Sequence, residues 1–501
     1  MLLSSASYMF FTMLSRISGF VREVLLAHYL GVGMESDAFF AAWRIPNSFR
    51  KLLADGGVSA AFVPLFVKVR TQSVEKSDIF SANIAVILFA ITCFITLLVE
   101  IFTPSIVAAV APGFAGDQAK TDLTILLSRI MMPYLPLISM VALLGGILNG
   151  VRVFSYFAAI QVIQNLSMII SVFIFGDLPN FVNYLSFSAV VGGVIQIAIM
   201  LYACKRNSVL PKFRFAVIHE IWHFFKSLFP VLISQGAMQI NIFVGTIFAT
   251  MTVGATSYLA YTDRIGLFAT TMIGYTLGTI SLPLISKKIS IGDKIGAVEI
   301  QKQCIEWAIL LAVPAAIAMI ILSQQIVTAL YGSPKFGIEH IIVVSKMLQF
   351  YAIAVPFIAI NRIFNSSFFA NSDTKIPMYI GITSALTNVV LNIILIKHIG
   401  FYAMIISTTI CSMIEFLLLC IFLKTKYNFL GLSTKNIKYL IISIICSLII
   451  SVEAKYIASK LLFLPLLSLL FAIFVAIISY ILLLFLTQII SIKDIWKMRN
   501  T

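Results

Sequence analysis

The chain has 501 residues, of which 60% are hydrophobic and 11% are charged, and its formal net charge is +15. A soluble globular domain carries about 25% charged residues, so this composition excludes an ordinary soluble domain and indicates a polytopic membrane protein. Most apolar runs reach the ~20 residues that a helix needs to cross a bilayer, and their continuity argues against the alternating pattern of a β-barrel.

The first 15 residues, MLLSSASYMFFTMLS, have neither a basic segment before the apolar run nor a small-residue cleavage site. We therefore expect no removable signal peptide. The six cysteines lie singly or far apart, with no CxxC pair and no histidine at a zinc-type spacing. We expect no disulfide, no cysteine-bound metal and no organic cofactor.

Hydropathy and turn residues predict fourteen membrane spans and therefore an all-α fold. The second span is long for one crossing, so we expect it to tilt, to bend at Pro46 or to extend beyond the lipid. The predicted spans cover residues 6–30, 36–67, 79–110, 123–150, 155–176, 182–204, 226–252, 257–285, 301–330, 340–370, 376–396, 400–423, 438–459 and 463–489.

The basic residues of the predicted loops are distributed unevenly. The loops after even-numbered spans, together with the C-terminal tail, hold 21 Lys and Arg residues, whereas the loops after odd-numbered spans hold 6. Because cytoplasmic loops are enriched in Lys and Arg, we place both termini and the even loops in the cytoplasm. The same rule explains much of the net charge, so we expect no nucleic-acid partner.

Eight basic residues fall within or at the edges of the predicted spans. An Arg or Lys at the centre of a membrane helix costs about 2.5–3.5 kcal/mol on insertion, so several together usually line a protein interior or a wet cavity. Acidic residues are fewer nearby, and the surplus of positive charge predicts a cavity that holds an anion. The eight residues are Arg16, Arg22, Arg44, Arg50, Lys51, Arg129, Arg264 and Arg362.

The two halves of the chain resemble each other at an offset of about 220 residues. VGMESDAFFAAWRI at 32–45 is similar to VGATSYLAYTDRI at 253–265 with one residue skipped, and further short matches follow in the same order. Because six spans precede the second copy, both copies have the same membrane orientation. We predict an N-lobe at 1–204, a basic linker with an interfacial helix at 205–225, a C-lobe at 226–425 and a C-terminal helix pair at 426–501.

Transporters built from such repeats bind their substrates where the two lobes meet. The cationic stretch 15–64 begins the N-lobe, and its counterpart in the C-lobe brings Asp263 and Arg264. We therefore expect a central cavity walled by arginines of both lobes.

Helical periodicity does not aim all of these arginines at one cavity. On an unbroken helix Ser15, Gly19 and Arg22 share one face. Arg16 and Glu23 share another face. A structural pair of Arg22 or Arg16 with Glu23 or Asp37 in a helix interface is an alternative to anion binding. A helix unwound at Gly19 would reconcile the two faces, which makes Gly19 a predicted hinge.

The second span poses a similar problem. Asp37, Arg44 and Lys51 recur at intervals of seven and form one stripe, whereas Arg50 lies off this stripe on an ideal helix. Pro46 removes a backbone donor and bends the chain, so the stripe need not continue beyond it. Pro46 is the second predicted hinge.

Five blocks of the sequence are similar to signature blocks of the MurJ/MviN family. They are SRISGFVRE (15–23), GMESDAFFAAWRIPNSFRKLLADGGVSAAFVP (33–64), APGF (111–114), YTDRIG (261–266) and FFANSDTKIP (368–377). Members of that family flip lipid II, the undecaprenyl-diphosphate-linked peptidoglycan precursor, and belong to a superfamily of oligosaccharide-lipid flippases and multidrug exporters. The likeness extends over essentially the whole chain.

Residue by residue, the resemblance implies a site in which arginines bind and neutralise the diphosphate. Two acids, Asp37 and Asp263, would orient these arginines when no substrate is bound. Leu267 departs from the family, because some relatives have an acidic or polar residue there, and this weakens an Arg–acid gate in the C-lobe. The implied substrate-binding residues are Arg16, Arg22, Arg50, Arg264, Asp37, Asp263, Arg44 and Ser15.

The family is also thought to bind sodium through side-chain oxygens of three spans in the C-terminal lobe. The matching residues of this chain are Asn241, Asn388, Asn392 and Thr408. A sodium-binding relative has carboxylates where this chain has Asn, and hard cations prefer charged oxygen ligands. The resemblance therefore implies at most a weak sodium site.

Together these features predict a transporter, not an enzyme, that flips lipid II across the bacterial inner membrane by alternating access during peptidoglycan synthesis. The lipid tail would lie along the groove of the last two helices. No nucleotide-binding loop occurs in the sequence, so an ion gradient, the membrane potential or consumption of the product would drive the step. The expected partners are lipid II, membrane lipids and cell-wall synthesis proteins. The alternatives are a flippase for another lipid-linked oligosaccharide and, against the arginine-rich cavity, a multidrug or cation antiporter of the same superfamily.

Overall fold

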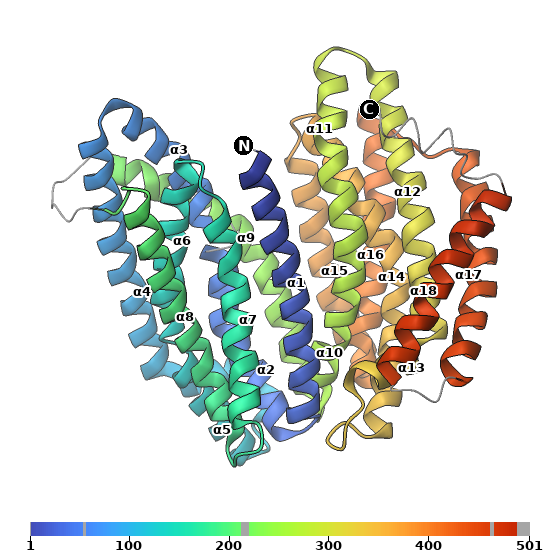
Figure 1. The fold of residues 1–501 in the computed structure, drawn as a ribbon, viewed down its shortest axis with the longest axis horizontal. Coiled ribbons are helices and arrows are strands. Elements are labelled where there is room, and N and C mark those ends of the chain that lie inside the picture. The colour runs from blue at the N-terminus through green and yellow to red at the C-terminus, as the bar shows by residue number, and fades with distance from the viewer. Residues whose placement is uncertain (1, 54–56, 212–219, 461–464, 488–501) are drawn as a thin grey trace. The chain divides into compact units, whose positions relative to one another are not determined.

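A computed structural model describes residues 2–53, 57–211, 220–460 and 465–487 of the chain (Figure 1). These residues form helices joined by short turns, and their β-structure is limited to an isolated antiparallel bridge between Ser333 and Phe336. The predicted all-α fold is therefore confirmed.

The helices follow the order predicted from the apolar runs, with some runs divided. Up to residue 250 they are α1 (Leu2–Leu30), α2 (Met34–Leu53), α3 (Gly57–Gln72), α4 (Val74–Val110), η1 (Pro112–Phe114), α5 (Gln118–Met131), α6 (Tyr134–Gly150), α7 (Ser155–Phe175), α8 (Phe181–Arg206) and α9 (Glu220–Thr250). After it they are α10 (Ala255–Thr270), the π-helical segment η2 (Thr271–Tyr275), α11 (Thr276–Ser290), α12 (Lys294–Ile321), α13 (Ser323–Tyr331), α14 (Ile338–Ala370), α15 (Lys375–Ile399), η3 (Gly400–Tyr402), α16 (Ala403–Tyr427), α17 (Thr434–Lys460) and α18 (Pro465–Leu486).

Within the described residues, ten helical segments are long and apolar enough to cross a membrane. This confirms a polytopic membrane protein. One of the ten, Lys375–Tyr427, contains both α15 and α16. The number of fourteen spans therefore stays a prediction.

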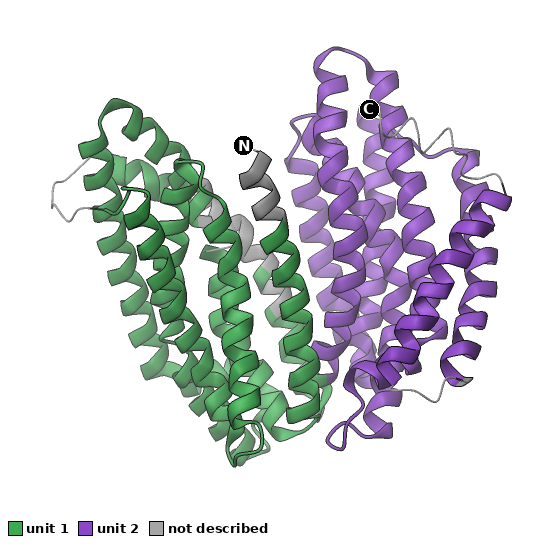
Figure 2. Ribbon diagram, in the orientation of Figure 1, with its two compact units in different colours: residues 1–257 green, residues 258–501 purple. Residues whose placement is uncertain are grey.

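The helices pack into two compact units, residues 1–257 and residues 258–501 (Figure 2). The predicted linker between the lobes lies earlier, at 205–225, and its residues 212–219 are outside the described part of the chain. The units divide later because α9, which begins within the predicted linker and ends at Thr250, packs against α2, α3 and α4 of the first unit. The predicted boundaries of the N-lobe, the linker, the C-lobe and the C-terminal helix pair therefore stay untested.

The core of the first unit surrounds α6, which is buried along most of its length. Two glycines of α6 allow aromatic side chains to approach its backbone. A Cβ atom on Gly146 would lie 3.0 Å from the ring of Phe62, and one on Gly150 would lie 2.5 Å from the ring of Phe66. Small residues permit such close packing in membrane proteins, where van der Waals contact drives helix association. The core contacts α2 and so supports the helix that carries Asp37.

The second unit is organised around α14, which contacts α11, α12 and α16. Helix α17 packs against α12, and Gln301 of α12 connects two neighbouring elements. Its Nε2 donates a hydrogen bond to Ser367 Oγ of α14 at 2.8 Å, and its Oε1 accepts one from the N–H of Gly431 at 2.6 Å. The buried amide therefore joins α14 to the segment that leads into α17.

Candidate functional site

Asp37 lies in the first turn of α2 and is completely buried. Its Oδ2 accepts hydrogen bonds from Lys120 Nζ at 2.6 Å and from the N–H of Gly254 at 2.9 Å. Its Oδ1 accepts from the N–H and Oγ of Ser257, at 3.0 and 2.6 Å. Because Gly254 immediately precedes α10 and Ser257 is its third residue, the carboxylate lies at the positive end of that helix. These partners differ from the arginines that we expected Asp37 to orient.

Lys120 of α5 is the charged partner of Asp37 and is 5% exposed. Its Nζ also lies 4.3 Å from the centroid of the Phe114 ring, a cation–π distance. Removing two charges from water is costly, and only good geometry and additional hydrogen bonds offset that cost. The four hydrogen bonds to Asp37 meet this condition, so the pair holds α2, α5 and the beginning of α10 together.

The same cluster brings together equivalent positions of the predicted repeat. When 32–45 is aligned with 253–265, Ser36 corresponds to Ser257. The Oγ atoms of these two serines lie 2.8 Å apart, and Ser36 Oγ also accepts from the N–H of Gly33 at 2.9 Å. Both copies therefore begin their helices at one polar cluster.

Arg22 of α1 is connected to α7 through an amide. Its Nη1 donates to Asn165 Oδ1 at 3.0 Å, and its Nη2 donates to Glu23 Oε1. Asn165 Nδ2 in turn donates to the carbonyl oxygen of Ser15 and to Ser18 Oγ, both at 3.0 Å. The pair with Glu23 is one of the structural ion pairs that we considered as an alternative to anion binding. One donor of the guanidinium, Arg22 Nε, is buried without a hydrogen-bond partner.

The other predicted arginines of the first unit are half-buried. Arg16 lies on α1, and Arg44 and Arg50 lie on α2. Arg50 Nε donates to Asn47 Oδ1 at 2.9 Å, an interaction one turn away on the same helix. The role of Arg50 in anion binding stays a prediction.

The two predicted hinges lie inside continuous helices. Helix α1 runs unbroken through the buried Gly19, and α2 runs through Pro46. An unbroken α1 keeps Arg16 and Arg22 on different faces. The structure therefore shows no unwinding at Gly19, and the hinge roles of both residues stay predictions.

The second unit contributes Asp263 and Arg264, which are half-buried on α10. The next turn approaches α14 closely, because a Cβ atom on Gly266 would lie 2.2 Å from the ring of Tyr351. Leu267, where the family pattern is broken, is 51% exposed. The ring of Tyr351 therefore lies against α10 close to this pair of charged residues.

Two of the four residues implied for sodium lie together on α15. Asn392 Nδ2 donates to the carbonyl oxygen and to Oδ1 of Asn388, each at 2.9 Å, and Asn392 Oδ1 is buried without a hydrogen-bond partner. Thr408 is exposed on α16 and donates to the carbonyl oxygen of Met404 at 2.8 Å. The side chain of Asn241 lies outside the described residues. One buried, neutral amide oxygen is therefore open to a hard cation, and neutral oxygens suit weak binding.

Comparison with known proteins identifies the family. A family profile described as lipid II flippase MurJ matches residues 26–476. The probable lipid II flippase MurJ of Rickettsia prowazekii is 33% identical over 78% of this chain and 78% of its own length. The chain belongs to the lipid II flippase MurJ family. This confirms the family that the five signature blocks indicated.

Further MurJ relatives and solved structures agree with this assignment. The probable lipid II flippase MurJ of Rhizobium tropici is 34% identical over 77% of this chain and 73% of its own length. A solved lipid II flippase MurJ in an inward closed conformation has a TM-score of 0.82 and 25% identity, and the match covers 98% of this chain and all of that one. The fold is shared with an inward-facing MATE multidrug transporter of the MOP superfamily. Its TM-score is 0.69 at 14% identity, and the match covers 82% of this chain and 95% of that one. The protein is thus a membrane transporter, as predicted, and not an enzyme.

The last MurJ-like block, 368–377, forms a junction of three helices around Asp373. Asp373 Oδ1 accepts from the N–H groups of Lys375 and Ile376 at the beginning of α15, at 3.0 and 3.2 Å. Its Oδ2 accepts from Lys426 Nζ at 2.8 Å and Tyr427 Oη at 2.7 Å, both at the end of α16. Burial opposes ionisation of the carboxyl, but these hydrogen bonds outweigh it and hold the pKa of Asp373 at about 2.

Two residues that contact the predicted site residues were missed by sequence reasoning. Lys120 was counted as a loop lysine, although the structure buries it against Asp37, 83 positions away. Asn165 lies in an apolar span, and a polar amide at such a position is a signal that could have marked it. Neither partner can be deduced from spacing along the chain.

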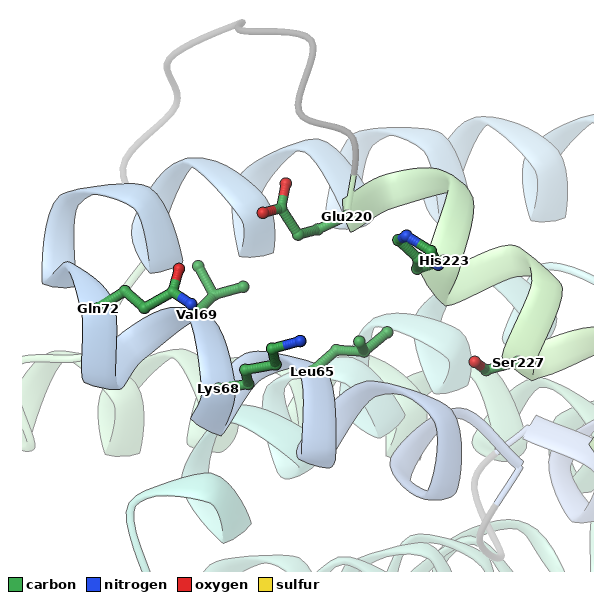
Figure 3. Close-up of a pocket in the computed structure, with 7 residues that line it drawn as sticks. All are labelled: Leu65, Lys68, Val69, Gln72, Glu220, His223 and Ser227. Carbon is green, nitrogen blue, oxygen red and sulfur yellow. The ribbon is translucent and has the colours of Figure 1, made fainter.

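A separate cavity of about 290 Å³ lies between the end of α3 and the beginning of α9 (Figure 3). Lys68 and Glu220 give it charges of both signs, His223 also lines it, and none of the predicted site residues does. Its remaining lining residues are Leu65, Val69, Gln72 and Ser227. A cavity with both a lysine and a carboxylate does not have the surplus of positive charge expected of a diphosphate site.

Proposed function

We propose that this protein flips lipid II across the bacterial inner membrane, with arginines of its membrane helices binding the diphosphate. Membership of the MurJ family is the observation that carries this proposal. The chain has arginines at the family positions in both units, including Arg22 and Arg264. Arg presents a planar fork that binds two phosphate oxygens at once, which suits a diphosphate better than the ammonium of Lys.

The contacts of Arg22 suggest how it would bind the substrate. Asn165 holds Nη1, so the guanidinium is oriented before the substrate arrives. Glu23 occupies Nη2, and Nε is buried without a partner. A diphosphate would displace Glu23 and satisfy Nε. The exchange of one anion for another would keep the arginine neutralised throughout, which limits the cost of a charge within the membrane.

The transport step that we propose is alternating access. The headgroup would bind from the cytoplasmic side and leave on the outer side, while the lipid tail follows the groove between α17 and α18. Both termini would lie in the cytoplasm, because basic residues accumulate in the even loops. The membrane potential or an ion gradient would supply the driving force, since one charge moved across 100 mV corresponds to about 2.3 kcal/mol.

A weak sodium site on α15 would be one way to use such a gradient. Asn388 and Asn392 of α15 would provide amide oxygens, and Thr408 of α16 would provide a hydroxyl oxygen. The buried Asn392 Oδ1 without a hydrogen-bond partner supports this proposal. If it is right, sodium should raise the unfolding temperature of the purified protein more than potassium does, and Asn392→Ala should abolish that difference. Equal stabilisation by the two ions would contradict a sodium site.

Complementation of a bacterium depleted of its lipid II flippase tests the proposed function. The intact chain should restore growth and prevent lipid II accumulation. Arg22→Gln, Arg50→Gln and Arg264→Gln should each fail at normal expression, because they remove the charge that binds the diphosphate. Arg206→Gln, which changes an exposed arginine that contacts Tyr156, should complement.

Two outcomes would count against the proposal. Growth with all three charge-removing variants would refute the arginine site. A well-inserted intact chain that fails to complement, but restores export of another lipid-linked glycan, would show that the substrate is not lipid II.

A further inference from the structure

Glu415 is a carboxylate in the middle of a membrane helix. It lies 12 residues from either end of α16, which spans Ala403–Tyr427. At a rise of 1.5 Å per residue, about 18 Å of helix separates it from each end. An ionisable residue at such a depth is costly and usually serves an ion pathway or a proton relay. The proposed diphosphate site does not include it.

The partners of Glu415 come from α14, which packs against α16. Asn365 Nδ2 donates to Glu415 Oε1 at a long distance of 3.5 Å, and Arg362 interacts with the carboxylate electrostatically. Cys411, one turn earlier on α16, also interacts electrostatically with Glu415. Helix α15 also packs against α16 and has no ionisable residue between Tyr379 and Lys397. Asn365 and Arg362, both of α14, are therefore the groups that stabilise the charge of Glu415.

Arg362 connects Glu415 to a different helix. A Cβ atom on Gly278 of α11 would lie 3.3 Å from Arg362 Cβ, and one on Gly274 would lie 3.6 Å from Arg362 Cγ. On the same side of α14, Ser366 Oγ donates to the carbonyl oxygen of Gly278 at 2.9 Å. The stem of Arg362 therefore packs directly on the junction between the π-helical segment and α11.

This junction lies in the helix that carries Asp263 and Arg264. Helix α10 continues through the π-helical segment η2 (Thr271–Tyr275) into α11. A π-helical segment interrupts the regular i to i−4 hydrogen bonding, and such segments are frequent at functional sites. It is also one of the identifiable causes of a helix bend. A change in the packing of Arg362 would therefore act on the part of this helix that bends most easily.

We propose that Glu415 is a proton-binding site whose occupancy sets the bend of α10–η2–α11 and thereby the position of Asp263 and Arg264. When Glu415 is ionised, its carboxylate attracts Arg362 and holds the arginine stem against Gly274 and Gly278. When a proton binds to a carboxylate oxygen, that attraction is lost and Arg362 moves toward a more polar environment. The proton shifts the helix between two bends because it binds more tightly to one of them.

The link to transport rests on the proposed function, but the conformational step does not. We would therefore test it on the purified full-length protein in lipid nanodiscs without substrate. Spin labels on genetically encoded noncanonical residues at Ile291 and Ile437 would leave the six cysteines in place. Both positions are exposed, at 68% and 58%, at the end of α11 and the beginning of α17. Their distance distribution would be measured by pulsed electron paramagnetic resonance from pH 5 to pH 9.

We expect the ratio of two distance populations to change at least twofold with pH in the native chain. Glu415→Gln should give the low-pH distribution at every pH, and Glu415→Asp should keep a transition with a shifted midpoint. Glu100→Gln is the matched control, because Glu100 is also within a membrane helix and interacts with Arg129 of the first unit. It should keep the native profile.

A distance distribution that does not change with pH in the native chain would overturn the proposal. A native-like pH profile in Glu415→Gln would do the same. If that variant does not fold, an unshifted midpoint in Glu415→Asp would be sufficient to refute it. Failure of complementation together with a pH-dependent distance would refute the flippase function and leave the proton site intact.

Discussion

The buried pair of Asp37 and Lys120 makes the sharpest prediction, because each partner can be removed separately. Asp37→Asn keeps the shape of the side chain but replaces one accepting oxygen by a donating NH₂ group. If that group takes the place of Oδ2, it faces Lys120 Nζ and the N–H of Gly254, which are both donors. If it takes the place of Oδ1, it faces the N–H of Ser257. Neither orientation satisfies all the donors.

The expected magnitude follows from burial. Lys120 is 5% exposed, so Asp37→Asn leaves a buried ammonium without a counter-ion. Removing one partner of a buried ion pair costs about 3–5 kcal/mol. Because about 1.4 kcal/mol corresponds to a factor of ten, opening of the first turn of α10 should become at least about 100-fold more frequent. Lys120→Met should cost less, about 1–3 kcal/mol, since three donors to Asp37 remain.

Hydrogen exchange of the purified protein, measured by mass spectrometry on peptides spanning 251–259, reports this local opening. The double variant should cost less than the sum of the two single variants by at least about 1 kcal/mol, because removing both charges leaves neither uncompensated. Asp122→Asn is the control on the same helix, since that carboxylate is exposed and accepts a hydrogen bond from Gln118. Additive single and double effects, or unchanged exchange in Asp37→Asn, would refute the reasoning.

Two further predictions concern packing and acid stability. Gly113→Ala should lower the thermal unfolding temperature, because its Cβ would lie 2.2 Å from the backbone oxygen of Thr250 and overpacking of this kind costs about 1–3 kcal/mol. Gly116→Ala should leave the unfolding temperature unchanged, because its Cβ meets nothing within 4 Å. Equal unfolding temperatures for the two variants would contradict the contact at Gly113. The pKa of Asp373, about 2, lies below the unfolded value of 3.8, so its contribution to stability is complete above about pH 4 and is lost as the pH falls toward 2. Unfolding temperatures measured between pH 6 and pH 2.5 should therefore fall less for Asp373→Asn than for the native chain, and parallel curves would show that this carboxylate does not contribute.

The sequence by itself determined the class of the protein. Long apolar runs require helices, because only helices or closed barrels satisfy the backbone hydrogen bonds within a bilayer. The signature blocks around Arg22 and Asp37 were sufficient to indicate the MurJ family, since they are long and keep their residue types. Family assignment depends on residue identity, which the sequence contains in full.

The tertiary structure decided which groups meet. Arg22 binds Asn165 across 143 positions, and Asp37 binds Lys120 across 83 and the N–H of Ser257 across 220. Periodicity places a side chain on a face of its own helix, but it does not contain the register of the neighbouring helix. The packing of α9 on α2, α3 and α4 was likewise decided by complementary surfaces and not by the order of the repeat. For these reasons the sequence could supply the charged residues of the site, and only the fold could show how each charge is compensated.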